Sequence, residues 1–197
     1  MKLTVDDIAD QRAYEREREE FRARIIDLKK VRRVGIGPFV TMVFENRDTI
    51  RFQVQEMARA EKILTDDAIQ IELDIYNPLI PERGSLAATL FIELTSKDDL
   101  VEWLPKLVGI ERSAELRIGR PGHEEVVRAR PDAEHERQLT RETVTASVHY
   151  VLFELTPEQV ERFASEPVRL GIAHANYAYA TELAETSKQS LLVDLRG

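Results

Sequence analysis

The chain of 197 residues is 43% hydrophobic and 32% charged, a composition typical of globular proteins rather than disordered ones. It contains no cysteine, which excludes disulfides, thiolate catalysis, iron–sulfur ligation and cysteine-based zinc sites. Its net charge is −8 and it has no run of about 18 apolar residues, so we expect a soluble, cytoplasmic protein that binds neither nucleic acid nor membrane.

The first predicted element is one long charged helix over residues 4–33, because Thr4 is a good N-cap and neither Gly nor Pro interrupts the segment. Its apolar residues form a narrow stripe: Ile8, Tyr14, Phe21, Ile25 and Leu28. A helix this charged packs either on its own domain or against a second chain. Since an antiparallel copy would bring the acidic segment 15–20 opposite the basic segment 29–33, we predict a homodimer.

Residues 39–45 and 49–52 are predicted to form two strands joined by a hairpin turn. The hydrophobic period then becomes helical, and Thr65 caps a further helix that ends before Pro78. Polar residues are dense around the predicted turn and the helix start: Glu45, Asn46, Arg47, Arg51, Gln55 and Glu56. These are candidate ligand-binding residues, because arginine binds a carboxylate or phosphate through two parallel hydrogen bonds. The alternative is an exposed hairpin with ordinary salt bridges inside the chain.

Two stretches of the chain resemble each other, "FIELTSKDDLVEWL" and "FELTPEQVERF". Each is typical of a strand end, a threonine N-cap and a helix with acidic residues in its first turn. The predicted caps are Thr95 and Thr156. A further strand follows each helix, so we predict two strand–helix–strand repeats over 86–119 and 143–173, and a final helix over 185–195. The repeats should lie side by side in an α+β fold with a mixed or antiparallel sheet.

The domain organisation follows from these elements. We expect residues 1–33 to form a charged N-terminal helix and 34–197 to form a single α+β domain. Residues 119–142 are polar and broken by prolines, which predicts a mobile surface loop. The loop contains His123 and His135, and we expect both imidazoles to be solvated.

A second candidate site is a metal centre. His149 shares the period of the apolar residues in its strand, so its side chain should be buried and need partners for both ring nitrogens. His174 ends the following strand, and Glu93 or Glu154 could supply an oxygen ligand. Two histidines and a carboxylate would suit iron, manganese or zinc. The alternatives are a structural hydrogen-bond network around His149 and solvated acids at the strand ends.

Several separate segments together resemble one bacterial family. They are "VTMVFENRDTIRFQVQEMARAE", "ELDIYNPLIP", "LVGIE", "TASVHYVLFELTPEQV" and "AHANY". The chain is similar to members of the domain-of-unknown-function family number thirty-five-oh-one, whose activity is undefined. Members are encoded close to rubrerythrin and to a heterodisulfide-reductase-like iron–sulfur protein. The resemblance therefore implies, by association, a role in peroxide defence or electron transfer, with a redox protein of either type as a partner.

Three functional hypotheses follow. The first is a non-catalytic accessory protein of a redox system that binds a metal or an anionic ligand. The second is a metal-dependent enzyme acting on a peroxide or small organic acid, with His149, His174 and a glutamate as ligands and Arg47 or Arg51 on the substrate. The third is a structural partner protein that dimerises through its N-terminal helix.

Overall fold

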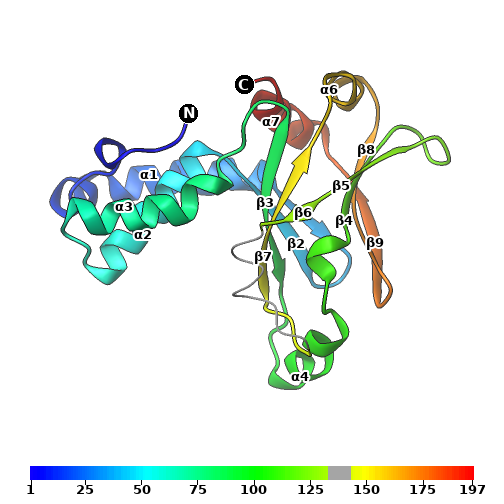
Figure 1. Ribbon diagram of the computed structural model, residues 1–197, viewed down its shortest axis with the longest axis horizontal. Helices are drawn as coiled ribbons and strands as arrows, with labels where there is room; N and C mark the ends of the chain where they lie inside the picture. Colours follow the sequence, from blue (N-terminus) through cyan, green and yellow to red (C-terminus); the bar gives the residue numbers. More distant parts are fainter. Residues whose placement is uncertain (133–142) are drawn as a thin grey trace.

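The N-terminal part of the chain forms a helical arm that projects from a body of two β-sheets (Figure 1). The computed structural model describes residues 1–132 and 143–197. The arm consists of α1 (Gln11–Arg32), α2 (Arg47–Glu61) and α3 (Asp66–Tyr76), with the short 3-10 helices η1 (Val5–Asp7) and η2 (Asn77–Leu79) at its ends. Within the described ranges, no helix is long and apolar enough to cross a membrane.

The body contains two antiparallel sheets. Sheet A has the order β1-β2-β3-β7-β6, with β1 Arg33–Ile36, β2 Val40–Glu45, β3 Ser85–Ile92, β7 Val148–Glu154 and β6 Arg130–Pro131. Sheet B has the order β5-β4-β8-β9, with β5 Glu125–Arg128, β4 Ala114–Ile118, β8 Val168–His174 and β9 Tyr177–Glu182. The helices of the body are α4 (Lys97–Lys106), η3 (Ile110–Arg112), α6 (Pro157–Ser165) and α7 (Glu185–Arg196). The predicted α+β class with antiparallel strands is confirmed.

The main hydrophobic core lies between the two sheets. Alternate residues of sheet A, such as Met42, Leu90 and Phe153, are buried in the same cluster as Leu116 and Leu170 of sheet B. This alternation is the period of two that places every second side chain on one face of a strand. The opposite face of sheet A is turned toward the arm, whose own core is a separate cluster formed mainly by α2, α3 and η2.

The two predicted repeats are β3–α4–β4 and β7–α6–β8. Their first strands pair with each other in sheet A, and their second strands pair with each other in sheet B. The units therefore lie side by side, as predicted. Thr156 caps α6 as expected, with Pro157 as the first helical residue. The cap of α4 is Ser96 rather than Thr95, and its hydroxyl accepts from the Asp99 amide at 3.0 Å.

The predicted hairpin after β2 is wrong, because residues 47–61 form α2. Asn46 caps this helix by accepting from the Thr49 amide at 3.0 Å, and the Thr49 hydroxyl accepts from the Asn46 amide at 2.9 Å. This capping box starts a helix whose buried face includes Ile50 and Val54. The helical packing overrides the strand propensity of the short "TIRF" segment.

The N-terminal helix also differs from its prediction. It begins at Gln11, where the Asp10 carboxylate accepts from the Arg12 and Ala13 amides, and it ends at Arg32, so that β1 follows directly. Its apolar stripe is buried inside the chain, where the Phe21 ring meets that of Phe52 on α2 at 5.4 Å. Most of the stripe is therefore covered within the chain. The predicted homodimer stays a prediction.

The segment predicted as the loop 119–142 contains two short strands. Residues 125–128 and 130–131 form β5 and β6, and His123 is exposed as expected. His135 and the rest of 133–142 lie outside the described residues.

Candidate functional site

Most of the predicted ligand-binding residues hold the N-terminal segment onto α2. Arg47 forms an ion pair with Asp7 at 2.5 Å, and Arg51 donates to the Asp7 carbonyl at 2.7 Å. The Gln55 amide both accepts from the Ala9 amide at 3.0 Å and donates to the Ala9 carbonyl at 2.8 Å. These side chains are occupied by backbone and carboxylate groups of their own chain.

Glu56 of α2 links this helix to α1. Its carboxylate accepts two hydrogen bonds from the Arg18 guanidinium, at 2.8 and 2.9 Å, and one from the Tyr14 hydroxyl at 2.7 Å. The Arg18 hydrogen bonds hold the pKa of Glu56 below its usual range, with a smaller contribution from Tyr14. With Asn46 acting as the cap of α2, these five of the six predicted residues therefore hold segments of the arm in place.

Glu45 lies at a cavity of about 140 Å³ between the arm and the outer face of sheet A. The cavity is lined by Lys29, Glu45, Ile50, Gln53, Tyr76, Leu79, Thr89, Phe91, Val148 and Tyr150. These residues come from α1, β2, α2, α3, η2, β3 and β7. The site is thus assembled from segments far apart in the sequence, where the arm meets the sheet.

The sheet register places the polar groups of the cavity on one face. Thr89 of β3 lies directly opposite Tyr150 of β7, and opposite residues of an antiparallel pair point to the same side. The Thr89 hydroxyl donates to Glu45 at 2.7 Å, and the Thr49 hydroxyl donates to the other carboxylate oxygen at 2.5 Å. Glu45 is buried, so its carboxylate is held in place and largely removed from water.

The two tyrosines of the cavity remain protonated at neutral pH. Burial raises the pKa of Tyr150 to about 12, with smaller contributions from Tyr76 and the negative charge of Glu45. Burial also raises the pKa of Tyr76, although its hydrogen bond with Gln53 opposes this shift. Both phenols are therefore neutral at this pH and do not act as bases.

Lys29 brings a positive charge to the edge of the cavity. Its side chain comes from the last turns of α1 and is half-buried. No described carboxylate lies within ion-pair distance of its ammonium group. The remaining walls are apolar and come from Ile50, Leu79, Phe91 and Val148. The cavity therefore combines one carboxylate, one ammonium and neutral donors with an apolar lining.

Sequence analysis found Glu45 but missed Lys29, Thr89 and Tyr150. Thr89 and Tyr150 are polar positions in the mainly apolar strand segments "LAATLFI" and "VHYVLF", and each falls on the face opposite the main core. That alternation is the signal that could have indicated a second, partly polar interface on sheet A.

The four predicted metal ligands do not meet in one site. Antiparallel pairing of β3 and β7 places their C-terminal ends at opposite ends of the strand pair. Glu154 lies opposite Ser85, eight residues from Glu93, so the two glutamates are separated by about 26 Å along the strands. Glu93 accepts from Thr41 at 2.6 Å and pairs with Arg33, and these contacts lower its pKa. Glu154 pairs with Arg130 at 2.7 Å.

The two histidines have separate partners as well. His149 is buried as predicted, with Nε2 at 2.8 Å from the Thr145 hydroxyl and 2.9 Å from the Ala146 carbonyl. Its Nδ1 lies 3.9 Å from the buried Glu111 carboxylate. His174 Nε2 contacts the Val108 carbonyl at 3.2 Å. In the part of the chain that the structure describes, no group of three or more His, Cys, Asp or Glu could hold a metal ion.

Comparison with known proteins identifies a matching family and a similar solved structure. The family model described as "Protein of unknown function (DUF3501)" matches residues 2–195. The chain is 37% identical to a crystal structure of a novel protein of unknown function from Burkholderia pseudomallei K96243, with a TM-score of 0.89 over 99% of this chain and 100% of that one. No curated protein matches the chain.

Proposed function

The chain belongs to the family of proteins of unknown function DUF3501, and we propose that it is a non-catalytic binding protein whose cavity holds a small amine-bearing molecule. The observation that carries this proposal is the buried carboxylate of Glu45 at the cavity between the arm and sheet A.

Glu45 supports recognition of a cationic group. A carboxylate has about four lone-pair positions, and the two threonine hydroxyls use only two of them. A negative charge removed from water is stabilised by a partner of opposite charge or by further donors. A primary ammonium supplies both, so an amine is the ligand group that best suits this end of the cavity.

Lys29 and the apolar walls narrow the ligand class further. The ammonium of Lys29 favours a carboxylate at the edge of the cavity, and the apolar side chains favour a short hydrocarbon body. The ligand that satisfies all three features is a small amino acid with an aliphatic side chain. Because Tyr76 and Tyr150 stay protonated, neither phenol acts as a base toward such a ligand, which supports binding rather than catalysis.

The redox context rests on the family resemblance. Relatives encoded near rubrerythrin and an iron–sulfur protein point to an accessory role in peroxide defence or electron transfer. In that setting, occupancy of the cavity would report the level of a small metabolite to a redox partner protein.

The test compares three probes that carry one or both ligand charges: L-valine, isobutylamine and isovalerate. A ligand of about eight heavy atoms gains roughly 4 kcal/mol, a Kd of about 1 mM, so amide chemical shifts are the suitable readout. We expect L-valine to bind most tightly, isobutylamine next and isovalerate least, with shifts concentrated at the lining residues. Glu45→Gln should weaken binding of both amines at least about tenfold, because it removes the charge and keeps the shape.

Matched variants separate a binding effect from a folding effect. Lys29→Met should weaken L-valine without affecting isobutylamine, which lacks the carboxylate. Tyr179→Phe is the control, because Tyr179 is exposed on β9 and does not line the cavity. If no probe shifts the lining residues, or if Glu45→Gln binds amines as tightly as the wild type, the proposal is wrong.

A further inference from the structure

Helix α3 exposes large apolar side chains on the outer surface of the arm. Ile71 is 60% exposed and Ile75 is 41% exposed, while Leu64, in the turn before the helix, is 76% exposed. The other side of the same helix is buried in the core of the arm through Ile69 and Leu73. The helix therefore carries two apolar faces, of which only one has a partner within the described chain.

The exposed face has the spacing of a coiled-coil seam. Ala68, Ile71 and Ile75 are separated by three and then four residues, which are the a, d and a positions of a heptad. A second helix packed along this seam would place its own apolar residues between them. The spacing specifies a helical occupant better than an irregular loop.

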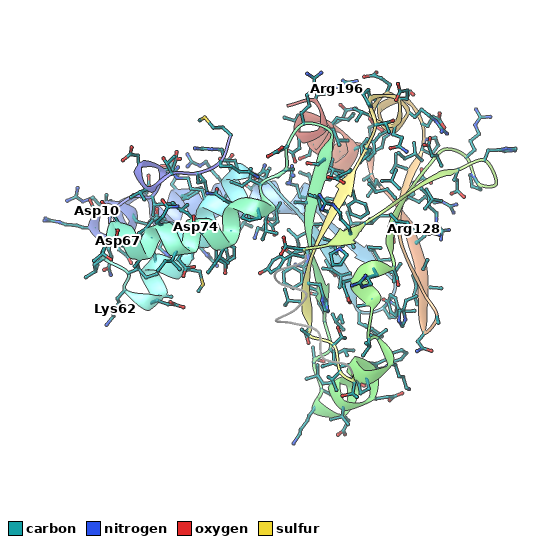
Figure 2. All side chains as sticks on the ribbon, viewed as in Figure 1. Asp10, Lys62, Asp67, Asp74, Arg128 and Arg196 are labelled. Atoms are coloured by element: carbon teal, nitrogen blue, oxygen red, sulfur yellow. The ribbon has the colours of Figure 1, made fainter. Side chains whose placement is uncertain are left out.

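The residues that flank the seam are all acidic. In the heptad frame, Asp67 and Asp74 occupy g positions and Glu72 occupies an e position. Burial raises the pKa of Glu72, and the negative charge of Glu61 adds to the effect. No lysine or arginine occurs in α3, Asp66–Tyr76. Figure 2 shows Asp67 and Asp74 on the arm, away from the two sheets.

This charge pattern disfavours a second copy of the same helix. In a parallel pair of α3 helices an acidic g position faces an e position that is acidic or neutral, and in an antiparallel pair Asp faces Asp. Like charges across a seam oppose association. An anionic membrane surface is disfavoured for the same reason. The complementary occupant carries lysine or arginine at its e and g positions.

We infer that α3 is a docking surface for an amphipathic helix of another protein, apolar along one seam and basic on both flanks. The 11 residues of α3 span about 16 Å, or three helical turns. A contact of this length is small, so the complex is transient, with its affinity shared between apolar burial and charge pairing.

The experiment uses three labelled helical peptides of three heptads each. The first has leucine at a and d and lysine at e and g, the second has glutamate at e and g, and the third keeps the lysines but has serine at a and d. Fluorescence anisotropy with the full chain should show the first peptide binding at least about tenfold more tightly than either of the others. The third peptide controls for general attraction to a chain of net charge −8.

Variants of α3 then test whether the peptide binds at this helix and whether the charges of α3 determine which peptide binds. Asp67→Lys with Asp74→Lys should reverse the preference, so that the glutamate peptide binds more tightly than the lysine peptide. Ile71→Gln with Ile75→Gln should abolish binding of both, whereas Val193→Gln on α7, also an exposed apolar residue, should change nothing. The inference is overturned if the preference does not reverse. It is also overturned if the wild type sediments as a dimer that Ile71→Gln with Ile75→Gln dissociates, because the occupant would then be a second copy.

Discussion

At the scale of single residues, polar side chains in the arm act as anchors between segments distant in the sequence. Gln55 fixes the backbone at Ala9, Arg47 and Arg51 fix Asp7, and Glu56 fixes α1 through Arg18. A dense polar cluster in the sequence looks the same whether it binds a ligand or its own chain. The distinction depends on whether another segment covers it, which spacing alone does not reveal.

Glu56→Gln tests the strength of this anchoring and its pH dependence. The pKa of Glu56 is lowered by Arg18 and Tyr14, so its contribution to stability is present above pH 4.5 and is lost as pH falls through the lower folded value. We expect the variant to lose about 1–2 kcal/mol at neutral pH, since Arg18 and Glu56 are partly exposed, and less at about pH 3, where protonation reduces the contribution of the wild-type carboxylate.

Urea unfolding at both pH values measures this difference. Glu20→Gln is the control, because Glu20 is far more exposed and its pair with Arg24 spans 3.7 Å. A stability loss for Glu56→Gln that persists unchanged in acid would contradict an electrostatic role for its carboxylate.

Of the residues that line the candidate cavity, only Glu45 was among the predicted ligand-binding residues. Its neighbours Thr89 and Tyr150 belong to strands about sixty residues apart in the chain, and only the register of β3 against β7 brings them together. Lys29 belongs to the basic segment 29–33 of the predicted N-terminal helix, and it lines the cavity because α1 packs against β1 and β2 of sheet A.

At the scale of elements, helices with strong local signals were predictable. Thr65 caps α3 and Thr156 caps α6 as expected, because capping is decided within a few residues. The start of α2 was predicted as a turn and a strand, because Asn46 resembled a turn residue and residues 49–52 are rich in β-branched and aromatic side chains. The helical period after residue 52 was recognised. The four-residue β1 carries too little pattern to be recognised alone.

Arg32 is the contact that joins three of these elements. It is the last residue of α1, it is 1% exposed, and it donates to the Phe44 carbonyl at 2.8 Å and the Glu45 carbonyl at 3.0 Å. Its guanidinium also pairs with Asp194 of α7. The same arginine therefore fixes the end of β2, from which the Glu45 side chain reaches the cavity.

We expect Arg32→Met to lower the free energy of unfolding by about 3–5 kcal/mol, because it leaves Asp194 and two backbone carbonyls without their buried partner. Arg22→Met, on an exposed position of the same helix, should change stability by less than about 0.5 kcal/mol. Guanidinium unfolding of both variants makes the comparison. Equal free energies of unfolding for the two variants would show that Arg32 does not hold α1, β2 and α7 together.

At the scale of the whole molecule, the internal repeat was visible in the sequence, but its division between two sheets was not. The two units share strand–cap–helix patterns that can be read locally. The pairing of β3 with β7 and of β4 with β8 depends instead on contacts between distant segments that share one hydrophobic core. The same applies to the arm. Its charged first helix indicated a separate element, and only the structure identifies α2 as the surface that covers it.

The burial of the α1 stripe gives a final prediction about assembly. Phe21 is 3% exposed and meets the rings of Tyr14 and Phe52 edge-to-face, at 6.5 and 5.4 Å. Phe21→Ala should therefore cost about 3–5 kcal/mol of stability through the cavity that it leaves. Because the ring is already covered within the chain, the molar mass measured by light scattering should equal that of the wild type at the same concentration.

The opposite results would show that the apolar stripe of α1 contacts a second chain. If Phe21 contacted a second chain, Phe21→Ala would reduce the molar mass while leaving the stability of the isolated chain nearly unchanged. Salt provides an independent check, since a dimer held by the acidic and basic ends of α1 would dissociate as ionic strength rises and screens charges beyond about 10 Å at 0.1 M. A dimer that survives both the substitution and the salt would have to use a surface other than this stripe.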